Sequence, residues 1–221
     1  MRQLTTGTSE VLLDVARDGS CLGYARCDSV IAVYTVLAAG GEPTLVSTQA
    51  WGELGFISPD GKRIILVAPV QHEGILRTEF RVFAASGAPT QASFALPPQG
   101  DDVAWSLDGN SIIFRDRALP GFNLYRLRFD GSPPQQITQF TEGRGFEYAW
   151  SPDGTHIAIE RAFDDGVENV WIVDADGRNP RQVPQFPSGI VFAIDWMADS
   201  RRLVVKQGQR SRDAALVRNF R

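Results

Sequence analysis

A turn motif that recurs five times constrains the fold of this chain more than any other feature of its sequence. Each copy consists of an apolar or aromatic residue, Ser-Pro-Asp-Gly or a variant of it, and a β-rich apolar run, as at residues 56–67 and 150–159. The aspartates of the five copies are 42, 48, 45 and 46 residues apart: Asp18, Asp60, Asp108, Asp153 and Asp199. A period of about 40–50 residues indicates an array in which one supersecondary unit is repeated.

A second tight turn follows each of the first four motifs, at residues 40–41, 86–87, 130–131 and 176–177. An extended segment precedes each of these turns, and a short one follows it. Each period therefore reads as strand, tight turn, strand, variable loop, strand, tight turn, strand. Pro59 and Pro152 favour the first central position of a type I turn, and glycine accepts the positive φ that closes the hairpin.

The runs that follow the first turns are apolar at consecutive positions, as at residues 64–67, which predicts that both faces of each sheet are covered. Sheets that pack face to face around an axis supply such an environment. We therefore predict an all-β fold, a β-propeller of four-stranded antiparallel blades. A β-sandwich is the main alternative, but its turns do not recur with this period.

We predict a single propeller domain over residues 1–221 with about five blades. The approximate blade boundaries are 9–49, 50–99, 100–142, 143–188 and 189–221 plus 1–8. Because the last period has only three strands, residues 2–5 are expected to pair with residues 214–218 and remove an exposed edge. The alternative is that the chain is the C-terminal part of a larger ring.

The motifs resemble the TolB-like (WD-repeat-like) propeller repeat, in which an aromatic-Ser-Pro-Asp-Gly turn joins the innermost strands and a later Asp-Gly turn precedes a short strand. Residues 150–154 with 176–177 are the best copy, and residues 136–138 match the strand that ends a blade. The resemblance covers essentially the whole chain. It implies a propeller that binds proteins or peptides, as in the C-terminal regions of bacterial regulators or kinases. The first copy departs from the pattern by lacking Ser-Pro, and the last by having Ser200 in place of glycine.

Function on such a scaffold usually lies on irregular loops that rigid strands position. The tight turns are expected at one end of the sheets, and the variable loops and blade linkers at the other. We predict a binding surface on the second end, made of Trp51, His72, Asp101, Asp102, Arg117, Arg144, Phe146, Asp164, Asp165 and Arg210. Trp51 lies in a linker, where an exposed aromatic side chain can anchor a partner. Trp105, Trp150 and Trp196 share one repeat position and are expected to pack between blades.

Several kinds of chemistry find little support in the sequence. With 22 basic and 26 acidic residues and a net charge of −4, the chain lacks the concentrated positive charge of a nucleic-acid-binding protein. The motifs Gly-x-Ser-x-Gly and Gly-x-x-x-x-Gly-Lys are missing, and His72 and His156 are interpreted as surface residues. The turn aspartates are explained by hydrogen bonds to their own turns. We predict no catalytic residue, no metal and no cofactor.

Cys21 and Cys27 lie on one expected strand, which separates them by about 20 Å and excludes a disulfide between them. No apolar run approaches the roughly 18 residues of a membrane span, and the N-terminus has no signal-peptide pattern. We therefore expect a soluble chain without membrane insertion. The sequence leaves its oligomeric state and compartment open, and a periplasmic or other extracytoplasmic location follows if the chain belongs to a longer protein.

Three functional readings remain. The first is a non-catalytic scaffold for a protein or peptide, either alone or as the sensory part of a larger bacterial regulator. The second is the propeller portion of a hydrolase, prolyl-oligopeptidase-like or lactonase-like. The lactonase-like kind needs a metal in the central channel, where Asp14, Glu147 and Asp195 are the acids of the inner strands. The third is a non-functional gene fragment.

Overall fold

The computed structural model describes residues 9–48, 55–88, 92–97, 99–118, 121–145, 147–163, 166–183 and 186–209. Every secondary-structure element found in these ranges is a β-strand. The strands form antiparallel sheets in which strands adjacent in sequence are adjacent in space. The chain divides into two compact units, which are described separately. Unit 1 is Met1–Arg117 with Leu124–Gln136, and unit 2 is Ala118–Asn123 with Ile137–Arg221.

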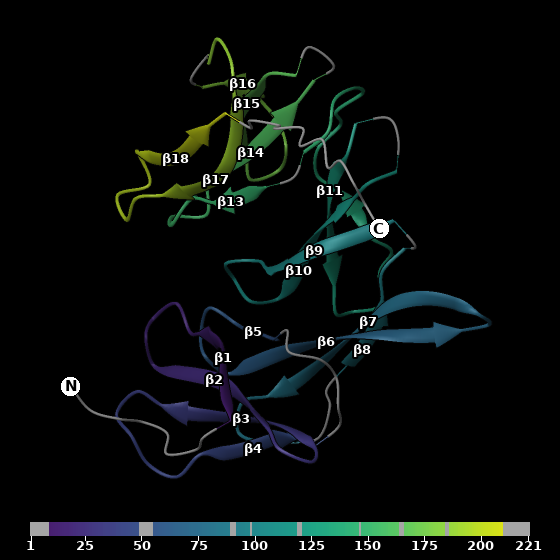
Figure 1. The fold of residues 1–221 in the computed structure, drawn as a ribbon, viewed down its shortest axis with the longest axis vertical. Helices are drawn as coiled ribbons and strands as arrows, with labels where there is room; N and C mark the ends of the chain where they lie inside the picture. The colour runs from purple at the N-terminus through teal and green to yellow at the C-terminus, as the bar shows by residue number, and fades with distance from the viewer. Residues whose placement is uncertain are drawn as a thin grey trace, which may run out of the picture. The chain divides into compact units, whose positions relative to one another are not determined.

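Unit 1 holds three four-stranded blades (Figure 1). Blade 1 consists of β1 (Glu10–Val15), β2 (Cys21–Cys27), β3 (Ile31–Leu37) and β4 (Thr44–Ser47). Blade 2 consists of β5 (Gly55–Ile57), β6 (Arg63–His72), β7 (Ile75–Ala84) and β8 (Ala92–Ala95). Blade 3 consists of β9 (Gly100–Trp105), β10 (Ser111–Asp116), β11 (Asn123–Arg128) and β12 (Gln135–Gln136).

Unit 2 holds a fourth blade of four strands and two strands of a fifth. Blade 4 consists of β13 (Tyr148–Trp150), β14 (His156–Ala162), β15 (Glu168–Asp174) and β16 (Arg181–Gln182). Blade 5 shows β17 (Ile190–Trp196) and β18 (Leu203–Gly208) within the described residues. The order of strands in every sheet follows the sequence, which confirms the predicted blade pattern of strand, turn, strand, loop, strand, turn, strand.

The apolar runs cover both faces of the blades, as predicted. In β6, Ile64 and Leu66 pack into the core between blades 1 and 2, while Ile65 packs into the core between blades 2 and 3. All three side chains are buried. Because neighbouring residues of a strand point to opposite faces, a strand with cores on both sides must be apolar at consecutive positions. Burying each such side chain contributes roughly 1.5–3 kcal/mol.

A buried serine organises each complete Asp-centred turn. The hydroxyls of Ser58, Ser106 and Ser151 donate to the aspartate two residues later at 2.7, 2.6 and 2.6 Å. Each also accepts the backbone N–H of the residue five positions later, at 2.9, 3.0 and 3.0 Å. The serine thus joins both sides of the turn, and the following glycine has positive φ, +67° at Gly61 and +75° at Gly154. The turn chemistry expected from the sequence is confirmed.

Hydrogen bonds between innermost strands connect neighbouring blades within each unit. The indole N–H of Trp105 donates to the carbonyl oxygen of Phe56 at 2.8 Å, and that of Trp196 donates to the carbonyl oxygen of Ala149 at 3.0 Å. Ile57 occupies the tryptophan position in blade 2, and there the Asp14 carboxylate accepts the Ile57 N–H at 2.8 Å instead. These bonds hold the inner strands at a defined spacing.

The last turn lacks glycine but keeps its geometry. Ser200 has a φ of +56°, a conformation that is strained for a residue with a side chain. Its hydroxyl accepts the backbone N–H of Asp153 from the turn of blade 4, at 2.9 Å. Serine lacks the conformational freedom of glycine at this position, but its hydroxyl forms a hydrogen bond between two blades.

The connection between β6 and β7 differs from the sequence interpretation. The variable loop that the sequence predicts between the second and third strands was expected at residues 70–77 in this blade, but the two strands stay paired up to His72 and Ile75. A two-residue turn joins them, with φ of +52° at Glu73 and +79° at Gly74, as in a type I′ hairpin. The sequence did not indicate this hairpin, because a Glu-Gly turn is less typical of type I′ hairpins than Asn-Gly or Asp-Gly.

Some predictions stay untested. The pairing of residues 2–5 with residues 214–218 lies outside the described residues, and the single-domain assignment over 1–221 remains a prediction. Cys21 and Cys27 are both free thiols at the two ends of β2, as expected. A search of the described residues finds no helix with the length and apolarity of a membrane span.

Replacing Ser151, which is fully buried, with alanine should destabilise the fold by about 1–3 kcal/mol, because the N–H of His156 loses its acceptor and Asp153 loses a donor. Ser188→Ala removes an exposed hydroxyl and should change the free energy of unfolding by less than about 0.5 kcal/mol. Chemical denaturation of the two variants and the parent measures both values. Equal stability of all three proteins would contradict the role of the serine.

Acid should weaken the same turn. The Ser151 hydroxyl, followed by the N–H and hydroxyl of Thr155, lowers the pKa of Asp153 from 3.8 to about 2. The folded state therefore gains stability from this carboxylate above about pH 4, and loses it as the pH falls towards 2. The difference in unfolding free energy between the parent and Asp153→Asn should be constant near neutral pH and shrink across that window. A difference that stays constant down to pH 2 would refute the linkage.

Candidate binding surface

The variable connections lie at the end of the sheets opposite the Asp-centred turns. We call this end of each unit the loop end, and the opposite end the turn end. In unit 1 the loop end carries the start of β9, the end of β10 and the tip of the β6–β7 hairpin. In unit 2 it carries the end of β14 and the start of β15.

Four charged residues of blade 3 form a cluster at the loop end of unit 1. Arg115 Nε lies 2.8 Å from Asp101 Oδ1, and Arg115 Nη1 lies 3.7 Å from Asp102 Oδ2. Arg117 Nε lies 3.0 Å from Asp101 Oδ2. We call these residues the charge cluster: Asp101, Asp102, Arg115 and Arg117.

A β-bulge places both aspartates on the same arginine. Asp101 pairs with Arg115 across the ladder, and the register shifts between Ile113 and Arg115, so that β9 contains one extra residue. Asp102 has a φ of +51° at this point. A regular strand would send Asp101 and Asp102 to opposite faces, whereas the bulge interrupts the alternation.

The two arginines of the charge cluster differ in their environment. The side chain of Arg115 is 13% exposed, whereas that of Arg117 is 49% exposed. Arg115 therefore holds the carboxylates in place, and the guanidinium of Arg117 reaches solvent with N–H groups beyond the Nε that contacts Asp101. An oriented, partly exposed guanidinium suits a carboxylate on a partner.

The β6–β7 hairpin extends beyond its blade at the same end of unit 1 (Figure 1). β5 pairs only with Ile64 to Leu66, and β8 pairs only with Glu79 to Val82. Beyond the pair Ala68 and Glu79, the two strands have only each other as partners among the described residues. Within the described part of unit 1, the backbone groups on the outer edges of this hairpin therefore have no strand partner.

Arg161 connects two loops at the loop end of unit 2. It is 1% exposed, and its Nη1 donates to the carbonyl oxygens of Gly121 at 3.1 Å and Phe122 at 3.3 Å. Its Nη2 donates to the carbonyl oxygen of Glu142. The guanidinium carbon lies 3.9 Å from the ring centroid of Phe140. Burial lowers the pKa of Arg161 to about 10, so the side chain stays charged at neutral pH.

Two asparagines at the start of third strands fix the linkers that follow their blades. Asn123 Oδ1 accepts the backbone N–H of Phe140 at 2.7 Å, and Asn169 Oδ1 accepts that of Phe186 at 2.7 Å. Both asparagines are buried, and the spacing of 17 residues is the same in the two blades. The loop end is thus a set of loops with defined backbone positions.

The structure brings together three of the ten predicted site residues. Asp101, Asp102 and Arg117 belong to the charge cluster, whereas Arg144 lies in unit 2 and forms a backbone bridge to Ala162. His72 is the last residue of β6, at the loop end as expected. The other five lie outside the described residues: Trp51, Phe146, Asp164, Asp165 and Arg210.

Sequence reasoning missed Arg115 and Arg161. A regular antiparallel ladder continued from the turn of blade 3 places Arg115 within one residue of Asp101, so the register of β9 and β10 could have revealed Arg115. No local pattern marks Arg161, because its acceptors are carbonyl groups of two separate loops.

Two of the three acids considered for a channel metal, Asp14 and Asp195, accept hydrogen bonds from backbone groups. Asp14 accepts the N–H groups of Val15 and Ile57, and Asp195 accepts that of Trp196. The described residues contain no group of three or more His, Cys, Asp or Glu residues arranged to hold a metal ion.

Comparison with known proteins identifies the fold. No family model matches the chain, and no curated protein matches its sequence. A solved structure, putative TolB from Agrobacterium tumefaciens, is similar with a TM-score of 0.63 over 91% of this chain and 72% of that one, at 20% identity. The chain has a TolB-like β-propeller fold.

Propellers of peptidases share this TolB-like fold. The acylaminoacyl peptidase of Pyrococcus horikoshii has a TM-score of 0.70 at 11% identity, over 90% of this chain and 35% of that one. The β-propeller domain of the Trilobed protease from Pyrococcus furiosus has a TM-score of 0.68 at 10% identity, over 91% and 66%. The chain therefore spans about a third of the first of these proteases. At these identities the likeness concerns the fold alone.

Arg161→Met should destabilise unit 2 by at least about 3 kcal/mol, because the carbonyl oxygens of Gly121, Phe122 and Glu142 lose a charged donor. Arg144→Met is the matched control: its side chain is exposed, and the change should cost less than about 0.5 kcal/mol. Thermal and chemical denaturation measure both. A similarly small loss of unfolding free energy in the two variants would contradict the role of Arg161 in holding the two loops together.

Proposed function

We propose that this chain is a non-catalytic propeller scaffold that binds a protein or peptide at the loop end of unit 1. The observation that carries the proposal is the charge cluster, which presents the Arg117 guanidinium on paired strands. Asp101 restrains this guanidinium before a partner arrives, so less side-chain entropy is lost on binding.

The expected ligand is an extended segment that carries a carboxylate. Its carboxylate would pair with Arg117, and its backbone would add to the free edge of the β6–β7 hairpin. Strand addition gives affinity through main-chain hydrogen bonds, and a charged contact beside it gives direction and specificity. The predicted residues that lie outside the described ranges, Trp51 among them, stay part of this proposal.

A second candidate is the propeller portion of a longer hydrolase. The similarity to the Pyrococcus horikoshii peptidase supports it, since 90% of this chain corresponds to 35% of that enzyme. An antibody against this chain distinguishes the candidates in cell extracts. A native protein of 24.3 kDa supports the free-standing scaffold, and a much larger one supports a multidomain protein.

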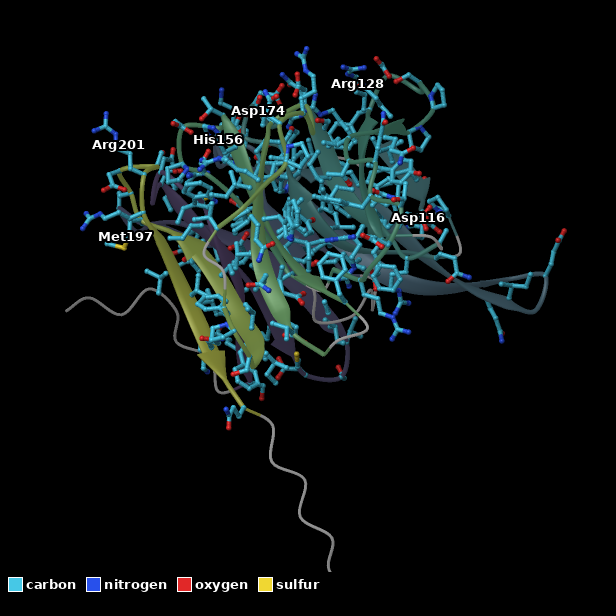
Figure 2. All side chains as sticks on the ribbon, turned by 90° about the horizontal axis from the view of Figure 1, so that it is seen from above. Asp116, Arg128, His156, Asp174, Met197 and Arg201 are labelled. Carbon is cyan, nitrogen blue, oxygen red and sulfur yellow. The ribbon has the colours of Figure 1, made fainter. Side chains whose placement is uncertain are left out.

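The binding proposal is tested by selecting peptides from a displayed random library against the full chain. Arg117→Ala should weaken the selected peptides about tenfold or more, because a charge-assisted hydrogen bond contributes about 1.5–3 kcal/mol. Arg128→Ala is the control, since Arg128 is an exposed arginine at the end of β11, at the turn end of the same blade (Figure 2). It should leave affinity unchanged within about twofold.

Two results would contradict the proposal. Peptides that bind the parent and Arg117→Ala with the same affinity would exclude the charge cluster. Peptides that lose affinity only in Arg128→Ala would place recognition at the opposite end of the blade.

A further inference from the structure

A cavity of about 640 Å³ opens at the turn end of unit 2, between blades 4 and 5. Two aromatic side chains, Trp196 and Phe186, line it together with aliphatic side chains of β15, β18 and the segment after β16. Its polar lining consists of His156, Arg181, Ser200 and Arg201. None of the predicted site residues belongs to it. We call it the turn-end cavity.

The charge of this lining is opposite to that of the chain. The net charge of the protein is −4, yet no acidic residue is found among the described residues that line the cavity. Neither Arg181 nor Arg201 has an ion-pair partner for its guanidinium within the described part of the chain. The adjacent acid Asp199 is already paired with Arg202 at 2.7 Å, and Asp176 with Arg178.

The aromatic wall of the cavity is held in place. Trp196 donates its indole N–H to the Ala149 carbonyl, which fixes the plane of the ring. The His156 ring lies 6.3 Å from the Trp196 ring, centroid to centroid, with an interplanar angle of 32°. Figure 2 shows His156 and Arg201 on the same side of unit 2.

His156 contacts two polar neighbours. Its Nδ1 lies 2.7 Å from the Thr155 hydroxyl, and its Nε2 lies 3.8 Å from Asp174 Oδ1. The imidazole presents a flat ring beside Trp196.

We propose that the turn-end cavity binds an organic anion that joins a flat or branched apolar body to a carboxylate. The apolar body packs against Trp196 and Phe186, and the carboxylate meets the guanidinium groups of Arg181 and Arg201. The volume lies within the range of about 300–1,000 Å³ that is usual for small-ligand sites. A small aromatic acid and the free C-terminus of a peptide with an apolar last residue share this chemistry.

The probes are 2-naphthoate, its neutral amide, and one short peptide ending in phenylalanine with either a free or an amidated C-terminus. Calorimetry with the full chain should show sub-millimolar binding of 2-naphthoate and at least about tenfold weaker binding of the amide. The chain has five tryptophans, and in a ¹H–¹⁵N spectrum only the indole signal assigned to Trp196 by Trp196→Phe should shift. Tighter binding of the free peptide than of naphthoate identifies the C-terminus of a polypeptide as the ligand of the cavity. Tighter binding of naphthoate identifies a small acid.

The double variant Arg181→Gln/Arg201→Gln should weaken naphthoate about tenfold or more without changing thermal stability, because both side chains are exposed. Arg17→Gln/Arg128→Gln removes two exposed cations elsewhere and should bind like the parent. Equal binding of acid and amide, unchanged affinity in the double variant, or no binding would overturn the proposal. The Arg117→Ala variant should bind naphthoate normally, so a failure of this proposal can be distinguished from a failure of the proposed function at the loop end.

Discussion

The fold depends on the fact that each blade has two apolar faces and only a neighbouring blade can cover them. Ile64, Ile65 and Leu66 show the constraint most directly, since consecutive residues of one strand belong to two different cores. A blade on its own would expose both of these faces to water, at a cost of several kcal/mol. The hydrogen bonds that Trp105 and Trp196 donate, and the one that Asp14 accepts, then set the spacing at which the inner strands meet.

Most of the fold was predictable because its determinants are local and repeated. The Ser-x-Asp turns act within six residues, so the motif reveals both the hairpin and the strands beside it. Consecutive apolar residues revealed the two covered faces in the same way. The β6–β7 hairpin was not predictable, because its Glu73-Gly74 turn is short and atypical of such hairpins.

The candidate site was predictable only in part, for a physical reason. Asp101, Asp102 and Arg117 could be assigned to the loop end from topology, but the bulge that gathers them on Arg115 depends on one extra residue in β9. Arg181 and Arg201 were not among the predicted site residues, because they belong to different blades and only packing brings them to one cavity. Cores and turns leave periodic signals, whereas sites assembled from separate blades do not.

The buried guanidinium of Arg161 has a consequence for the order in which unit 2 assembles. Burying a charge is strongly unfavourable unless its hydrogen-bond acceptors are already in position. The carbonyl groups of Gly121, Phe122 and Glu142 come from segments on either side of a whole strand pair, so neither loop can settle before β14 is in place. Transient opening of β14 would then release both loops together, and their amide hydrogens would exchange as one cooperative group.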